Sequence, residues 1–194
     1  MDFLNIHTHH ELPEGETTVL SVGLHPWHLT EDWMEKMPEI EQMLMKGDSF
    51  VGECGLDRVC ETPYERQLAA FAAQIALSER LQRPLILHCV RALDDVLRLK
   101  RAASQTWVFH GFRGKPQQLR QLLDHGFYVS FGFRYNEESL MLCPLDRLFL
   151  ETDDAPRSIV PLYESVARLR KISVVELQEQ LWTNLRSVMN CAER

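Results

Sequence analysis

The sequence has no long hydrophobic run and no N-terminal export signal. No stretch reaches the length of about 18 apolar residues that would indicate a membrane-spanning helix. The opening residues, MDFLNIHTHHEL, show no basic region followed by an apolar block, which is the pattern of a secretory signal. We therefore expect a cytoplasmic protein with no membrane association.

The cysteines show no regular pattern. The five cysteines are an odd number at irregular spacing, which disfavours a disulfide framework. We interpret Cys54 and Cys89 as reduced packing residues. The full set is Cys54, Cys60, Cys89, Cys143 and Cys191.

Basic residues do not predominate either. The chain has 21 Lys and Arg against 28 Asp and Glu, a formal net charge of −7. This balance disfavours tight nonspecific binding to nucleic acid, because that binding depends on cationic residues that neutralise phosphates. It does not exclude a phosphate-bearing substrate, since bound metal ions can supply local positive charge.

Repeats, low-complexity tracts and linker-like segments are also absent. Hydrophobic residues make up 45% of the 194 residues and charged residues 25%, as in an ordinary globular protein. We therefore expect one domain over residues 1–194, with no obligate protein partner.

Short apolar segments of β-type alternate with stretches of helical period. The predicted strands are Phe3–His7, Thr18–Gly23, Ser49–Gly52, Pro84–His88, Thr106–His110, Phe127–Phe131 and Arg147–Glu151. The predicted helices are Glu31–Lys46, Tyr64–Gln82, Ala92–Arg101, Pro116–His125, Pro161–Lys171 and Val174–Met189. Ser173 and Glu176 have the spacing of a capping box, and Gly126 has the position of a helix stop. This alternation predicts an α/β fold with a parallel sheet.

Histidine or carboxylate residues end five of these apolar segments, or lie just past them. The segments FLNIHTH, SFVGE, PLILH, WVFH and RLFLETD deliver His7, His9, Glu53, His88, His110 and Asp153. In parallel α/β folds the carboxyl ends of the strands face the ligand. Closure into a TIM-barrel-like fold would bring all these ends around one centre, although seven strands are one fewer than a regular barrel has.

Each of these residues also has an ordinary explanation when it is taken alone. His88 or His110 would more often be a satisfied buried histidine than a ligand, Glu53 could pair with Arg58, and the acidic run at Asp153 could be a loop. Six independent ordinary explanations are needed, however, whereas one metal site accounts for all six positions. Imidazole and carboxylate together suit zinc, manganese, iron and similar divalent ions.

The ordered series of motifs resembles the TatD family of metal-dependent hydrolases, related to TatD deoxyribonuclease in the amidohydrolase-like superfamily. The resemblance covers nearly the whole chain and depends on NIHTH, GLHP, GECGLD, PLILH, HGFRG, YVSFG and LETDDAP, together with Gln67, Phe71 and Gln74. It implies a TIM-barrel metal-dependent hydrolase fold, two divalent metal ions such as Zn, Mn or Mg, and hydrolysis of DNA ends or another phosphodiester.

Roles for single residues follow from the matching motifs. The resemblance implies that His7 and His9 bind one cation with Asp153, that Glu53 bridges to a second cation, and that His88 and His110 complete the second position. It further implies that Asp153 is the general base and that His25 faces the substrate. Arg113 is a candidate for binding a substrate phosphate.

Two departures from the family pattern matter. Asn5 stands where the family usually has Asp, which alters how the neighbouring histidines are oriented. Only residues 11–17 lie between HTHH and the next predicted strand, where the family has a further βα unit. We therefore expect a seven-stranded, distorted or incomplete barrel, because a change in strand number changes tilt and stagger.

Three functions stay open from the sequence. The leading hypothesis is a divalent-metal-dependent phosphodiesterase or deoxyribonuclease in which the metal activates water and Asp153 accepts a proton. The second is an amidohydrolase acting on a small amide, ester or lactone. The third is a degenerate metal-binding protein without turnover, which Asn5 and the missing unit favour and the six retained ligands disfavour.

Overall fold

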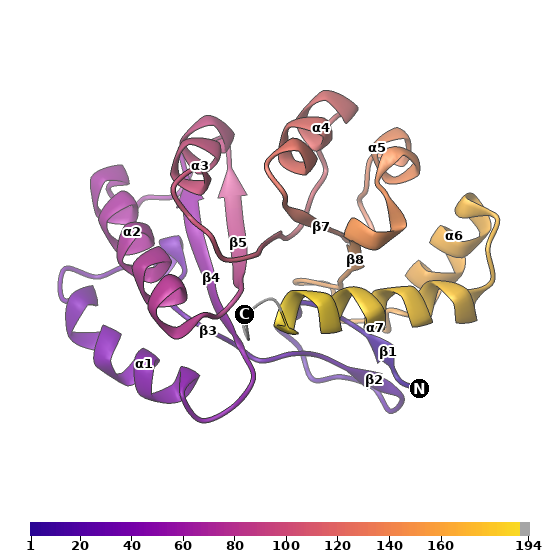
Figure 1. Ribbon diagram of the computed structural model, residues 1–194, viewed down its shortest axis with the longest axis horizontal. Coiled ribbons are helices and arrows are strands. Elements are labelled where there is room, and N and C mark those ends of the chain that lie inside the picture. The colour runs from indigo at the N-terminus through magenta and orange to yellow at the C-terminus, as the bar shows by residue number, and fades with distance from the viewer. Residues whose placement is uncertain (191–194) are drawn as a thin grey trace. The chain divides into compact units, whose positions relative to one another are not determined.

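The structure is a computed structural model that describes residues 1–190 of the chain. Cys191 lies outside the described residues. The chain divides into two compact units, of which the first comprises Met1–Val19 and His110–Val188. The second comprises Leu20–Phe109 with Met189 and Asn190. Each unit is built from parallel strands with helices between them, which agrees with the predicted α/β class (Figure 1).

The second unit has four parallel strands in the order β3-β4-β5-β6. These strands are Ser21–Val22, Phe50–Asp57, Leu85–Val90 and Trp107–Phe109. Its helices are α1 (Met37–Leu44), α2 (Tyr64–Leu81) and α3 (Leu93–Lys100), with 3-10 turns η1 at Pro26–His28 and η2 at Trp33–Lys36. Apolar side chains fill the space between α2 and the turns, where Leu29, Trp33 and Ala70 form one buried cluster.

Strand β4 is longer than the sequence predicted. We expected it to end at Gly52, but it continues to Asp57, and all eight of its residues are buried. The pairing with β5 joins Val51 to Leu85 and Cys54 to Leu87, so β4 holds one extra residue between these pairs. Such a β-bulge lets a strand continue past a glycine and turns a side chain to a new direction. Glu53 therefore lies within the strand, at the bulge, rather than beyond its end.

The first unit has the strand pairs β1 with β2 and β7 with β8. These strands are Phe3–Leu4, Glu16–Thr17, Tyr128–Phe131 and Leu148–Leu150. The amide of Ile6, just after β1, donates to the carbonyl of Leu150 at 3.0 Å, so the segment after β1 lies beside β8. The helices of this unit are α4 (Pro116–Asp124), α5 (Glu137–Leu142), α6 (Val160–Arg170) and α7 (Val174–Asn190), with a 3-10 turn η3 at Leu145–Arg147.

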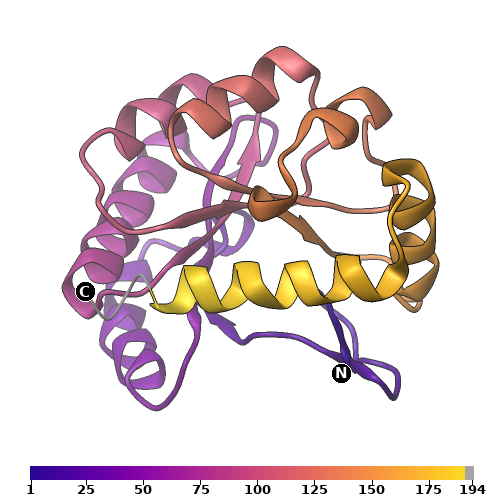
Figure 2. The ribbon, with the colours of Figure 1, turned by 45° about the vertical axis from the view of Figure 1, so that its right-hand side comes forward.

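Helices α6 and α7 hold the N-terminal segment of the chain in place. On α6, the hydroxyl of Tyr163 donates to the carbonyl of Leu4 at 2.8 Å. On α7, the indole of Trp182 donates to the carbonyl of Asp2 at 2.9 Å, and the Gln178 amide donates to the carbonyl of Met1. Figure 2 shows the long helix α7 and the N-terminus of the chain. The segment that leads into His7 is therefore fixed by hydrogen bonds from two helices.

Strands β1 and β2 are joined without a helix. Residues 5–15 between them have no helical turn, although a parallel connection usually contains a helix. The segment therefore lacks a helix, as the missing βα unit predicted. The predicted number of seven strands is wrong, because residues 1–190 contain eight strands. The additional strand is β2, whose two residues are too few to produce an alternating pattern in the sequence.

All predicted helices except the first are confirmed to within one residue at each end. Residues 31–46 divide into η2 and α1, because Pro38 in the first turn of α1 lacks the amide that a continuous helix needs. The predicted capping box is present, since Ser173 N donates to Glu176 Oε2 at 2.7 Å and Glu176 N donates to Ser173 Oγ at 3.1 Å. Gly126 has a φ of +76°, as expected of a helix stop. We did not predict the six-residue helix α5.

Among residues 1–190, no helix has both the length and the apolar character that crossing a membrane requires.

Candidate metal centre

The first unit brings together His7, His9 and Asp153. One donor atom from each lies within 4.8 Å of the others. The Nε2 atom of His9 lies 3.6 Å from Oδ1 of Asp153, which is longer than a hydrogen bond. Two donors on one ion, each about 2.1 Å from it in tetrahedral geometry, would lie about 3.4 Å apart. The spacing therefore suits two ligands of one cation.

The backbone explains why His7 and Asp153 are neighbours although they are far apart in sequence. The amide of Asp153 donates to the carbonyl of His7 at 3.1 Å, and the amide of His9 donates to the carbonyl of Asp153 at 3.1 Å. These bonds form a parallel bridge between Thr8 and Asp153. Asp153 has a φ of +54°, in the left-handed region that Asp adopts more readily than most residues. The same residue thus supplies the bridge and the carboxylate.

Asn5 and Thr152 reinforce this bridge with a buried network of side chains. The Asn5 amide donates to Thr152 Oγ1 at 2.8 Å, and its oxygen accepts from the Thr152 amide at 3.1 Å. Thr152 Oγ1 in turn donates to Thr8 Oγ1 at 3.0 Å. An Asp at position 5 could accept but, when ionised, could not donate. The network therefore uses the side-chain amide donor of Asn5, which the Asp that is usual in the family would lack when ionised.

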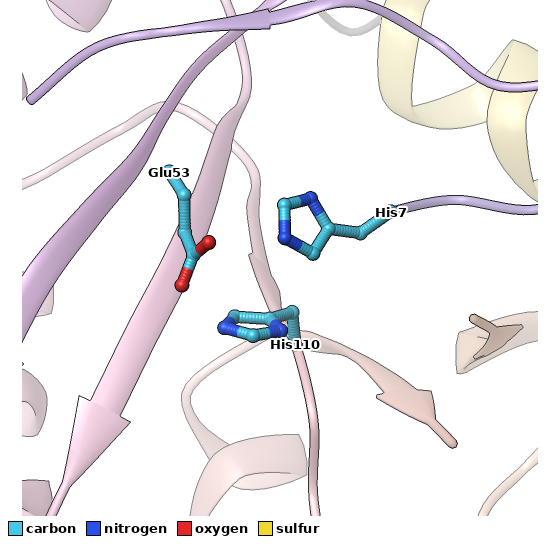
Figure 3. A group of neighbouring side chains, drawn as sticks. All are labelled: His7, Glu53 and His110. Carbon is cyan, nitrogen blue, oxygen red and sulfur yellow. The ribbon is translucent and has the colours of Figure 1, made fainter. Parts of the chain in front are cut away.

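His110 and Glu151 extend the group in the first unit. His110 directly follows β6, and its Nδ1 lies 3.3 Å from Glu151 Oε1. With Asp153 these residues form another set whose donors lie within 4.8 Å of one another. The rings of His7 and His110 have centroids 4.8 Å apart; Figure 3 shows both, together with the Glu53 side chain of the second unit.

Glu151 is completely buried, and its charge state depends on its neighbours. Burial by itself raises the pKa of this carboxyl, but the adjacent imidazoles of His110 and His7 and the hydrogen bonds to it hold the pKa below its ordinary value. Glu151 is therefore a carboxylate at neutral pH, and it can keep His110 oriented.

The second unit brings together His25, Glu53 and His88, whose donors also lie within 4.8 Å of one another. Glu53 Oε1 lies 3.1 Å from His25 Nε2 and 2.8 Å from His88 Nδ1. His88 Nε2 lies 3.1 Å from Asp57 Oδ2, so both ring nitrogens face carboxylates. All four side chains are largely withdrawn from solvent, with exposed fractions of 17% or less for His25, His88, Glu53 and Asp57.

Glycines on β4 allow this close approach. Gly55 has a φ of +144°, and a Cβ atom there would collide with the carbonyl oxygen of His88. Gly52 has a φ of +141°, and a Cβ atom there would collide with the carbonyl oxygen of Ile86. Only glycine lets β4 and β5 pair at these two points. The two glycines of the GECG motif are thus required for β4 to pair with β5 on both sides of Glu53.

Two buried glutamines of α2 hold the backbone next to the second group. Gln67 accepts from the amide of Asp57 at 2.7 Å and donates to its carbonyl at 3.0 Å. Gln74 accepts from the amide of Leu24 at 2.7 Å and donates to its carbonyl at 3.2 Å. Leu24 directly precedes His25, so each glutamine fixes a peptide unit that carries a member of the site.

Trp27 completes the surroundings of the second group. Its indole donates to Asp57 Oδ2 at 2.6 Å, although 57% of the residue is exposed. The pKa of Asp57 is lowered because the hydrogen bonds from Trp27 and His88 together outweigh the effect of burial. The pKa of His25 is lowered, mainly by burial and against the opposing effect of Glu53. A neutral imidazole is the form that can bind a metal.

The donor chemistry of both groups fits a divalent cation. Each set combines two imidazoles with a carboxylate, without sulfur, which is a combination suited to zinc, manganese or iron. In the first unit, His7, His9 and Asp153 would hold the ion. In the second unit, His25, Glu53 and His88 would hold it, with Asp57 orienting His88.

The structure distributes the predicted site residues over both units. His7, His9, His110 and Asp153 are grouped in the first unit, and Glu53 and His88 in the second. His25, for which we predicted a substrate contact, contacts Glu53 and lies beside His88. Arg113 is exposed in the segment between β6 and α4, outside these groups.

Sequence reasoning missed Glu151 and Asp57 as members of the site. Glu151 directly follows β8 in the segment LFLETD, so the strand-end rule that selected Asp153 applied to it as well. Asp57 ends β4, and it was missed because we predicted the strand to end at Gly52.

Comparison with known proteins gives relatives for nearly the whole chain. A TatD 3′–5′ single-stranded DNA/RNA exonuclease from Klebsiella pneumoniae is 35% identical over 159 residues, 73% of this chain and 60% of the relative. The corresponding exonuclease from Erwinia tasmaniensis is 31% identical over 202 residues, 88% of this chain and 77% of the relative. The chain thus spans about three fifths of the length of the Klebsiella relative.

Solved structures show the same fold. A TatD homologue from Escherichia coli K12 has a TM-score of 0.76 at 23% identity, over 92% of this chain and 78% of the homologue. A TatD-family hydrolase from Entamoeba histolytica has a TM-score of 0.77 at 16% identity, over 90% of this chain and 75% of that one. These matches confirm the predicted TIM-barrel-like fold class, while the distortion of the barrel stays a prediction. The family model of the TatD-related DNases matches residues 4–190, and the chain therefore belongs to that family.

Proposed function

We propose that this protein is a divalent-metal-dependent phosphodiesterase that acts on the ends of single-stranded DNA or RNA. The observation that carries the proposal is the grouping of His7, His9 and Asp153, with donor atoms within 4.8 Å of one another, in a chain of the TatD-related DNase family. The names of the Klebsiella and Erwinia relatives support single-stranded nucleic acid as the substrate.

Two divalent cations form part of the proposal, one at the group in each unit. A cation bound there would supply Lewis acidity, which lowers the pKa of water and polarises a phosphoryl oxygen. The chain's own residues would hold and orient the reactants. Asp153 is proposed to accept a proton from the attacking water, and the 21% exposure of its side chain supports this role.

His9 is the most accessible of the proposed ligands, with 55% of its side chain exposed. Substrate and water can therefore reach the group in the first unit from solvent. Arg113, also exposed and in the same unit, is proposed to bind a phosphate of the substrate. A cytoplasmic location is part of the proposal too, supported by Cys54, Cys60, Cys89 and Cys143, which are free thiols among the described residues.

The test is metal reconstitution followed by substrate comparison. Protein stripped with a chelator is loaded with Mn²⁺, Mg²⁺ or Zn²⁺ and incubated with a single-stranded DNA oligonucleotide labelled at its 5′ end. We expect stepwise shortening from the 3′ end, with none before metal is added. A parallel panel of small amides, esters and lactones is the matched comparison. Hydrolysis of that panel alone would replace the proposal with an amidohydrolase activity, and hydrolysis of neither substrate class would replace it with metal binding without turnover.

A further inference from the structure

A pocket of about 390 Å³ lies in the first unit beside the connection that lacks a helix. Its lining comes from that connection and from the segment after β8, and includes Thr8, Glu11, Glu16, Thr152 and Arg157. The volume falls within the range of about 300–1,000 Å³ that is usual for small-molecule sites. The short loop between β1 and β2 therefore leaves room for a ligand.

The pocket is lined by sequence neighbours of the candidate ligands of the first unit. Thr8 lies between His7 and His9 in the chain, and Thr152 precedes Asp153. Both threonines line the pocket, and their hydroxyl groups are hydrogen-bonded to each other at 3.0 Å. A ligand in the pocket would thus contact the backbone segments that carry three of the proposed metal-binding side chains.

Arg157 gives the pocket a planar cationic wall. Its guanidinium lies over the ring of Phe133, with the central carbon 3.3 Å from the ring centroid. The residue is exposed and lines the pocket, so a second planar group in the pocket can contact the guanidinium. Guanidinium planes and aromatic rings are the groups on which proteins stack nucleobases.

The lining holds two carboxylates and one guanidinium, together with the imidazole of His10, whose Nε2 lies 3.0 Å from the carbonyl oxygen of Asp154. Glu11 is exposed at the pocket, and Glu16 accepts from Ser158 Oγ at 2.6 Å and from the amide of Ile159 at 3.0 Å. Two carboxylates against one guanidinium disfavour a phosphate in this pocket, because like charges would be brought together. The same carboxylates favour a group that donates hydrogen bonds, such as an exocyclic amino group.

We propose that this pocket binds the nucleobase of a nucleotide next to the scissile phosphodiester, and that it prefers bases with an exocyclic amino group over thymine or uracil. The base stacks on Arg157, and its amino group donates to Glu11. The position of the pocket beside a bond that is cleaved rests on the proposed function, whereas recognition of the base itself does not require turnover.

Binding of nucleosides to the metal-free protein tests the recognition alone. Deoxycytidine and thymidine are the probes, because they carry the same sugar and no phosphate, and cytosine has an exocyclic amino group where thymine has a carbonyl oxygen, beside the N3–H and 5-methyl group of thymine. Titration followed by NMR should show deoxycytidine binding at least several-fold more tightly. Equal affinities, or no binding of either probe at millimolar concentration, would overturn the inference.

Three variants separate stacking, hydrogen bonding and charge. Arg157→Ala should weaken both probes roughly 5- to 150-fold, the range of a lost base stack. Arg157→Lys should behave like it, since Lys keeps the charge but has no planar group. Glu11→Gln should reduce the preference for deoxycytidine and leave thymidine binding close to that of the unmodified protein. Arg120→Ala, at an exposed residue of α4, is the control that should change nothing. Unchanged binding in Arg157→Ala would contradict the proposal.

Turnover tests the link to the proposed activity. Oligonucleotides that differ only in their terminal residues, cytosine, thymine or an abasic site, should be shortened by the metal-loaded protein in that order of rate. Hydrolysis of all three at equal rates would contradict the base pocket and leave the proposed function unaffected. Base-selective binding of nucleosides without any hydrolysis would support the base pocket and contradict the proposed function.

Discussion

The first unit exposes part of its candidate metal-binding group, whereas the second unit buries nearly all of its own. In the first unit, 55% of the His9 side chain and 21% of the Asp153 side chain are exposed. In the second unit, His88 is 11% and Glu53 5% exposed. The first group is therefore suited to exchange water and substrate. The second is suited to hold a cation in a fixed environment, where carboxylates orient both imidazoles.

The two units also support their groups by different means. In the first, backbone bonds between the segments of His7 and Asp153, with the Asn5–Thr152 network, bring the ligands together. In the second, Gln67 and Gln74 of one helix hold the peptide units beside the ligands. In both units, buried polar groups outside the ligands fix the backbone that carries the ligands. Each unit provides these groups from its own elements.

Replacement of Asp153 should have the largest effect on turnover. Asp153→Asn keeps the size of the side chain but removes the proton acceptor, and we expect kcat on single-stranded DNA to fall roughly 10²- to 10⁴-fold. The circular dichroism spectrum and thermal midpoint should stay close to those of the unmodified protein. Turnover near the original rate would show that the exposed group is not where the proton is accepted.

Metal content should distinguish the two groups directly. His7→Ala removes a ligand from the first unit, and His88→Ala removes one from the second. We expect elemental analysis of protein purified without chelator to show two ions in the unmodified chain and one fewer in each variant. His125→Ala, at a partly exposed histidine of the first unit that belongs to neither group, is the matched control. Two ions retained in either ligand variant would remove that group from the metal sites.

Loss of the helical support should destabilise the second unit. Gln67→Leu leaves the amide and carbonyl of Asp57 without their buried partner, at a cost of about 1–3 kcal/mol in the free energy of unfolding. Urea denaturation of the metal-free protein measures this, with Gln42→Leu at an exposed position of α1 as the control. A change below that of the control would mean that Gln67 does not support Asp57.

The network at Asn5 offers the corresponding test in the first unit. Asn5→Leu removes one acceptor and one donor from Thr152, and we expect the free energy of unfolding to fall by about 1–3 kcal/mol. Because the network joins the segments of His7 and Asp153, affinity for the first-unit cation should fall as well, as a chelator competition would reveal. Lower stability with unchanged metal affinity would limit Asn5 to a structural role.

The smallest effect is expected at Arg113, which is exposed. Arg113→Ala should raise KM for single-stranded DNA by less than tenfold and leave kcat unchanged. Removal of one phosphate contact should also reduce the slope of log KM against log salt concentration by about 0.7. Arg120→Ala is the matched control on α4. An unchanged salt slope would remove Arg113 from the substrate site.

Much of the fold could be predicted, because apolar periodicity records which faces are buried. The helices α2, α3, α4, α6 and α7 were predicted to within one residue at each end. Strand β2 and helix α5 were missed, since elements of two and six residues carry too little periodicity. The early end predicted for β4 has a similar cause: Gly52 marks a turn in most sequences, but here it accommodates a bulge.

The sequence by itself determined the kind of chemistry. The alternation of apolar segments with helical stretches indicated the α/β class, and the imidazole and carboxylate residues at the ends of those segments indicated the six candidate ligands. Such information is local, because a strand end can be recognised from its own residues. The tertiary structure alone decided that Glu151 joins His110, that Asp57 faces His88, and that a pocket lies beside Thr8 and Arg157. These contacts depend on bulges, bridges and loop paths between distant segments, which no local pattern records.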